Sequence, residues 1–102
     1  MIHNKWSISL WYLVFFLSLS WGGLANEFEA GKKALDQKDY LNAVKSFRAG
    51  VAKGDKLSPN ALGELYVLGL GVDKDKSIAC RLFLKGAERG DAAAQHNYGI
   101  CM

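Results

Sequence analysis

The feature that most constrains the fold of this chain is an internal repeat with a period of 36 residues. Shifted by 36 positions, the segment DYLNAVKSFRAGVAKGD aligns with DKSIACRLFLKGAERGD. The matching pairs fall on small and aromatic positions, namely Ala43 with Ala79, Phe47 with Phe83, Gly50 with Gly86 and Gly63 with Gly99. Close packing constrains such side chains most, so the repeat predicts structural units that stack on one another.

Each unit is expected to contain two helices. In the second unit, Ser58 followed by Pro59 is typical of a helix start, with Ser58 as the N-cap and the proline at the first helical position. Apolar residues then recur at three-to-four spacing, which gives this helix one apolar side, and Gly69 is expected to end it. The first unit has a capping-box-like start at Asn26 and Glu29, and we expect its helices over residues 27–37 and 40–53.

The second helix of the second unit is expected to begin after Asp75, a good N-cap, and to stop at Gly90. Asp91 is expected to cap a last helix. The chain would therefore supply two hairpins and one further helix, over residues 26–54, 58–90 and 91–102.

Glycines occupy two kinds of position in this pattern. Three are expected at turns, where a positive φ costs glycine little: Gly69, Gly71 and Gly90. Three others fall inside predicted helices: Gly63, Gly86 and Gly99. A glycine inside a helix costs about 1 kcal/mol relative to alanine, so we expect a neighbouring helix to approach each of these three closely.

Residues 1–25 have the three-part pattern of a secretory signal. Lys5 precedes an uncharged run over residues 6–21, and the small residues Gly23 and Ala25 then suit cleavage after Ala25. The alternative is an uncleaved membrane anchor, although the run is shorter than the ~20 residues of a spanning helix. Cleavage would leave one small domain over residues 26–102 with no stable membrane span.

The charges of the predicted domain are evenly mixed. Loss of Lys5 with the leader lowers the formal net charge from +3 to +2, and no basic run remains. Nucleic acid is therefore not expected as a partner.

The chain offers little catalytic or metal-binding chemistry. Cys80 and Cys101 lie in helices expected to be adjacent, where a disulfide would close a loop of about 20 residues; two buried free thiols are the alternative. His96 lies five positions from Cys101, which turns the two side chains apart on a helix, and zinc sites need three or four protein ligands. We therefore predict no metal, no cofactor and no enzymatic activity, since no nucleophile–base pair stands out either.

The segment ALGELYVLGLGVDKDKSIACRLFLKGAERGDAAAQHNYG resembles the Sel-one-like repeat, a relative of the tetratricopeptide repeat. Its repeat positions are Gly63, Tyr66, Gly69, Gly71, Ala79, Phe83, Gly90 and Gly99. The sequence departs from the repeat pattern at Leu82, Gly86 and Tyr98, where an aromatic residue, an alanine and a leucine are usual. The first unit lacks the GLGV-type turn and is similar to a plain tetratricopeptide unit. The resemblance implies an all-α fold of α-α hairpins stacked as a short right-handed solenoid.

The resemblance also implies a binding surface, because the first helix of each hairpin lines the concave face in tetratricopeptide-like proteins. Carried over to this chain, that face consists of Phe28, Lys32, Leu35, Asp36, Asn60, Glu64, Val67, His96 and Ile100. The implied function is an exported, non-catalytic scaffold, periplasmic or secreted, that binds a protein or peptide. The alternatives are a small-molecule binder or β-lactam hydrolase, like cysteine-rich relatives, and a fragment of a longer repeat protein.

The last predicted helix leaves three interpretations open. About three repeats are usually needed for a stable stack, and this helix has no polar outer face. It either caps the stack, or docks a partner or a second copy of the chain, or belongs to a truncated array.

Overall fold

The computed structural model describes residues 27–102, and these form five α-helices and no strand. The expected leader over residues 1–25 and the capping residue Asn26 lie outside the described residues. The prediction of an all-α fold is confirmed for the described part. The helices are α2 (Glu27–Asp36), α3 (Tyr40–Ala52), α4 (Ser58–Leu68), α5 (Lys76–Glu88) and α6 (Ala92–Cys101).

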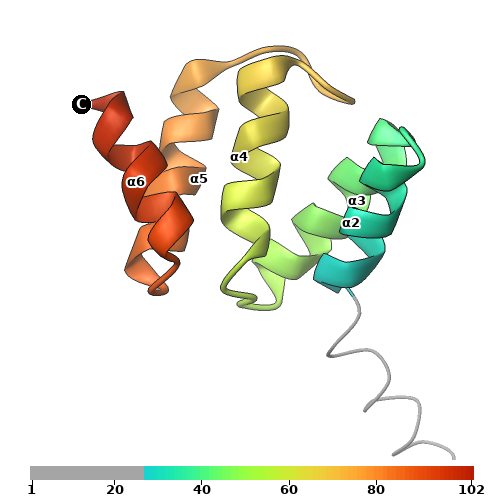
Figure 1. Ribbon diagram of the computed structural model, residues 1–102, viewed down its shortest axis with the longest axis horizontal. Coiled ribbons are helices and arrows are strands. Elements are labelled where there is room, and N and C mark those ends of the chain that lie inside the picture. Colours follow the sequence, from blue (N-terminus) through green and yellow to red (C-terminus); the bar gives the residue numbers. More distant parts are fainter. Residues whose placement is uncertain (1–26) are drawn as a thin grey trace, which may run out of the picture.

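Each helix packs mainly on its neighbours in the sequence (Figure 1). Helices α2 and α3 form one hairpin, α4 and α5 form a second, and α3 contacts α4 where the two hairpins meet. Helix α6 packs on α5 and also reaches α4. In Figure 1, α4 and α6 run in the same direction and α5 runs in the opposite one.

Aspartates and glycines set the helix ends as the sequence predicts. The side chain of Asp75 accepts a hydrogen bond from Ile78 N at 3.1 Å, and that of Asp91 accepts one from Ala93 N at 3.1 Å. Each carboxylate satisfies a backbone N–H that has no partner within its helix. The predicted turn glycines all have positive φ: Gly69, Gly71 and Gly90.

The start of α4 differs from its prediction. Ser58 lies inside the first turn and is fully buried, and the N-cap position falls on Leu57. Asp55 Oδ2 accepts hydrogen bonds from Ser58 N at 2.7 Å and from Ser58 Oγ at 2.6 Å, so the serine donates where a capping serine would accept. The assignment of Ser58 as N-cap is wrong because the aspartate three residues earlier already satisfies this helix end.

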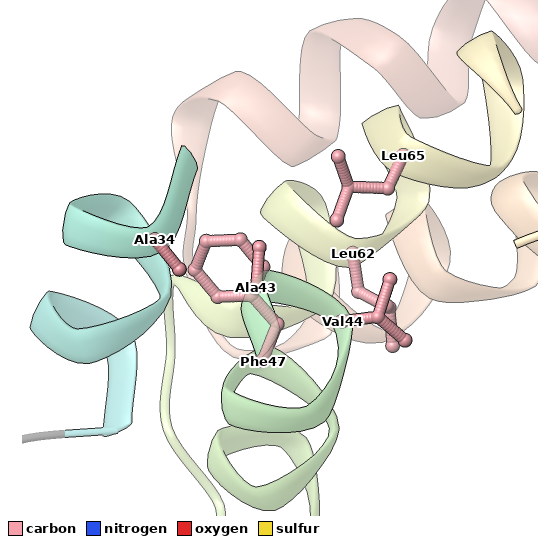
Figure 2. Packing of buried hydrophobic residues seen from close by; sticks show 6 residues of the cluster. All are labelled: Ala34, Ala43, Val44, Phe47, Leu62 and Leu65. Carbon is pink, nitrogen blue, oxygen red and sulfur yellow. The ribbon is translucent and has the colours of Figure 1, made fainter. Parts of the chain in front are cut away.

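The core is centred on the ring of Phe47. Figure 2 shows this ring directed toward Ala34 on α2, and Val44 directed toward Leu62 on α4. The ring is fully buried, and the Phe28 ring packs against it with 5.9 Å between the centroids. Burial of one such side chain stabilises a fold by about 2–3 kcal/mol, so Phe47 holds the first hairpin together, while Val44 and Leu62 join it to the second.

Within both hairpins, a glycine on the first helix lies under a phenylalanine on the second. A Cβ atom at Gly31 would collide with the Phe47 ring, and one at Gly63 would lie 2.6 Å from Phe83 Cε1. These helices approach so closely that hydrogen alone fits at the contact. The cost of Gly63 inside a helix is therefore offset by ring packing.

A second glycine contact recurs where each hairpin meets the helix that follows it. A Cβ atom at Gly50 would collide with Ser58 Oγ, and one at Gly86 would lie 2.7 Å from Ala94 Cβ. Both pairs follow the 36-residue period. Gly99 behaves differently, because a Cβ atom there would meet nothing within 4 Å. The expectation that a neighbouring helix covers Gly99 is therefore wrong within the described residues.

Candidate functional site

A hollow of about 710 Å³ lies between α4, α5 and α6, and we call it the α4–α6 hollow. Its volume falls in the range of ligand-binding clefts, roughly 300–1,000 Å³. Apolar side chains and a disulfide form much of its lining: Val67, Leu68, Phe83, Ile100 and the Cys80–Cys101 bridge. The polar lining residues are Glu64, Lys76, Ser77 and Asn97.

The disulfide forms part of the wall and joins α5 to the end of α6. The Cα atoms of Cys80 and Cys101 are 5.9 Å apart, a usual separation for bridged cysteines. The bond ties down the last turn of α6, the part of the helix that carries Ile100 into the hollow. Helix ends fray readily, so this bond keeps the hollow in shape.

Two asparagines hold α6 against α4 at the edge of the hollow. Asn97 Nδ2 donates to Asn60 Oδ1 at 2.8 Å, and Asn60 Nδ2 donates to Glu64 Oε1 at 3.3 Å. Asn60 is buried, so these bonds satisfy a side chain that would otherwise destabilise the packing. The chain of hydrogen bonds also reaches the Glu64 carboxylate at the edge of the hollow.

The charges that line the hollow balance. Glu64 and Lys76 contribute one of each sign, and neither forms an ion pair with another residue in the 27–102 segment. Both are exposed, so each stays available to a ligand at low desolvation cost. The hollow therefore suits an apolar group that is flanked by polar or charged ones.

The predicted binding face is only partly brought together. Glu64, Val67 and Ile100 line the hollow, and Asn60 bonds at its edge. His96 is exposed on α6 and does not line it.

The four predicted residues of the first unit lie on α2, away from the hollow. Phe28 packs on the core, and Lys32 Nζ lies 5.5 Å from the centre of its ring. Leu35 also packs against the core, and Asp36 is exposed.

Several lining residues are not among those that the tetratricopeptide resemblance implies for the binding face. They lie on α5, or at positions of α4 and α6 that the resemblance did not select. They are Leu68, Lys76, Ser77, Phe83 and Asn97. A rule that selects only the first helix of each hairpin cannot find the residues at the start of α5. The cysteine pair is the one sequence signal that points to this end of the molecule.

A second hollow of about 690 Å³ lies where α3 meets the turn between α4 and α5. Three of its polar side chains, Arg48, Tyr66 and Asp75, already have partners within the chain, whereas Asp73 is exposed. Arg48 Nη2 donates to Tyr66 Oη at 2.8 Å, and Asp75 caps α5. The hydrogen bonds in this hollow therefore hold the two hairpins together, and we do not assign a ligand to it.

Within residues 27–102, no group of three or more His, Cys, Asp or Glu side chains could hold a metal ion. The same segment contains no helix that is long and apolar enough to span a membrane.

No family model matches the chain, and the searches of curated proteins and of solved structures found no match. The functional conclusion therefore depends on the helices and on the hollow that they form.

Proposed function

We propose that the chain is an exported, non-catalytic helical-repeat scaffold that binds a segment of another protein in the α4–α6 hollow. The observation that carries this proposal is the apolar lining, which remains open to solvent. Leu68 is 65% exposed and Ile100 is 72% exposed, and both line the same hollow. Large apolar side chains gathered around a hollow are typical of interaction sites.

The repeated contacts support a solenoid of the tetratricopeptide and Sel-one-like kind. Glycine lies under phenylalanine in both hairpins, and the contact between each hairpin and the helix that follows it recurs with the sequence period. Equivalent contacts in successive units are what stacked helical repeats require. In this proposal, α2–α3 and α4–α5 are two stacked hairpins and α6 begins the next unit.

The disulfide and the leader pattern together support export to the periplasm or the cell exterior. Disulfides persist in oxidising compartments and are rare in the cytosol. The Cys80–Cys101 bridge fits a protein whose leader over residues 1–25 directs it out of the cytoplasm.

The shape and lining of the hollow favour a peptide with apolar anchors. Val67, Leu68 and Ile100 would receive an aliphatic or aromatic side chain, since burial of each CH₂ group contributes about 0.8 kcal/mol. Glu64 and Lys76 would pair with a basic and an acidic group beside that anchor. Grooves of this kind hold amphipathic helices or extended segments.

A displayed library of random peptides, selected on the purified chain, tests this function. Selected peptides should lose at least about tenfold in affinity when Leu68→Glu or Ile100→Glu places a charge in the apolar lining. Both side chains are largely exposed, so neither change should unfold the protein.

Leu41→Glu is the matched control, because Leu41 is 75% exposed on α3 and does not line the hollow. If this control weakens binding as much as the variants in the hollow do, the proposed site is wrong.

A further inference from the structure

Helix α6 and the residue that follows it expose a strip of side chains, three of which have buried counterparts on α4. The strip comprises Ala92, Gln95, His96, Gly99 and Met102, which share one side of the helix and are all exposed. None of them is Asp, Glu, Lys or Arg, and none lines the α4–α6 hollow. We call this set the outer strip of α6.

The repeat identifies what covers the matching strip on α4. Pro59, Asn60 and Gly63 lie 36 positions before Gln95, His96 and Gly99, and all three are buried. Helix α5 covers them: Phe83 lies over Gly63, and a Cβ atom at Gly86 would lie 3.5 Å from Pro59 Cβ. The part of the outer strip formed by Gln95, His96 and Gly99 is thus the same surface without a covering helix among the described residues.

The covering helices of this protein share a pattern. Helix α3 places Phe47 over Gly31, and its buried Ala43 and Gly50 lie four positions before and three after that ring. Helix α5 repeats this arrangement with Ala79, Phe83 and Gly86. A glycine notch on this fold therefore accepts a phenylalanine from the covering helix, which also carries an alanine four positions before the ring and a glycine three positions after it.

We propose that the outer strip of α6 docks a helix from a partner protein, antiparallel to α6, with a phenylalanine in the Gly99 notch. The surface continues an interface that the chain already builds twice. Its lack of Asp, Glu, Lys and Arg matches the apolar face that α3 and α5 present to their own glycines. The space at Gly99 lets the two backbones come close, and the ring supplies the buried area.

The α5 sequence itself provides the probe. A labelled synthetic peptide of residues 75–91, with Cys80→Ser to prevent disulfide exchange, is titrated with the purified full chain and followed by fluorescence anisotropy. We expect saturable binding. Binding should weaken at least about tenfold when the peptide carries Phe83→Ala, because the ring is the anchor of the docked helix.

Two protein variants locate the binding site. Gly99→Leu fills the notch and should also weaken binding at least about tenfold, whereas nothing nearby in the free chain opposes the added side chain. Ala93→Leu is the control, because it adds apolar bulk at an exposed position of α6 outside the strip. Far-UV circular dichroism and the mass of the oxidised protein check that both variants keep the fold and the disulfide.

Three results would overturn the proposal. The first is that the peptide does not bind at millimolar concentration. The second is that it binds equally well to Gly99→Leu, because it would then be displacing the chain's own α5. The third is that sedimentation shows a dimer of the purified chain and that Gly99→Leu abolishes this dimer. A second copy of the chain, and no partner helix, would then cover the strip.

Discussion

Gly63→Ala adds a single methyl group on α4 directly under the Phe83 ring of α5. The new Cβ atom would lie 2.6 Å from Phe83 Cε1 and 2.8 Å from Phe83 Cδ1, closer than real Cβ contacts come. The Phe83 ring is buried, so it cannot move away without disturbing its neighbours. We therefore expect this small substitution to destabilise the fold although alanine is the better helix former.

The magnitude follows from two opposing effects. Alanine in place of glycine inside a helix stabilises it by about 1 kcal/mol. Overpacking of a filled core costs about 1–3 kcal/mol, so the net loss should reach up to about 2 kcal/mol. Gly99→Ala isolates the first effect, because it makes the same chemical change where no atom lies within 4 Å. The two variants should thus differ by about 1–3 kcal/mol in free energy of unfolding.

Urea unfolding followed by circular dichroism at 222 nm measures this difference, with thermal unfolding as a second assay. For a domain of this size, each 1 kcal/mol should shift Tm by about 4–8 °C. Gly99→Ala should match or exceed the stability of the unmodified protein, and Gly63→Ala should fall below it. Equal stability of the two variants would refute the close approach of α4 and α5 at Gly63.

Three further predictions test other parts of the account. Cys80→Ser should lower the free energy of unfolding by about 3 kcal/mol under oxidising conditions and have little effect under reducing ones; an equal loss under both would contradict a stabilising bridge. Arg89→Met removes donors to two backbone carbonyl oxygens of the preceding hairpin and its loop, so it should destabilise by about 1–3 kcal/mol, whereas the exposed Arg81→Met should leave Tm nearly unchanged. All tryptophans lie in residues 1–25, so protein recovered outside the cytoplasm should show no tryptophan fluorescence; a tryptophan signal there would show that the leader is retained.

The sequence predicted the helices well because their signals are local. Aspartate caps, turn glycines and apolar spacing act over a few residues, and the observed bounds lie within about two residues of the expected ones. The close approaches at Gly63 and Gly86 could also be predicted, since a glycine inside a helix is costly without such a contact.

Gly99 shows where this reasoning fails. It lies 36 positions after Gly63, yet no atom lies within 4 Å of a Cβ atom built there. A repeat pattern gives the surface that each helix presents, but it does not give the neighbour that covers that surface. The prediction that Ser58 caps α4 was wrong because Asp55, three residues earlier, accepts the hydrogen bonds at this helix end.

The hollow was harder to predict than the helices because it depends on how three of them lie together. Lys76 and Ser77 line it from the start of α5. The tetratricopeptide resemblance implies a binding face on the first helix of each hairpin and so does not include α5. The predicted residues of α2 lie elsewhere because Phe28 and Leu35 pack against the core of the first hairpin.

The most direct test of the recurring glycine–phenylalanine contact is a nuclear Overhauser measurement on the purified, isotope-labelled protein. We predict cross-peaks from the Gly31 Hα protons to the Phe47 ring and from the Gly63 Hα protons to the Phe83 ring. Intact helices that lack both cross-peaks would contradict the packing from which the hollow and the outer strip are inferred.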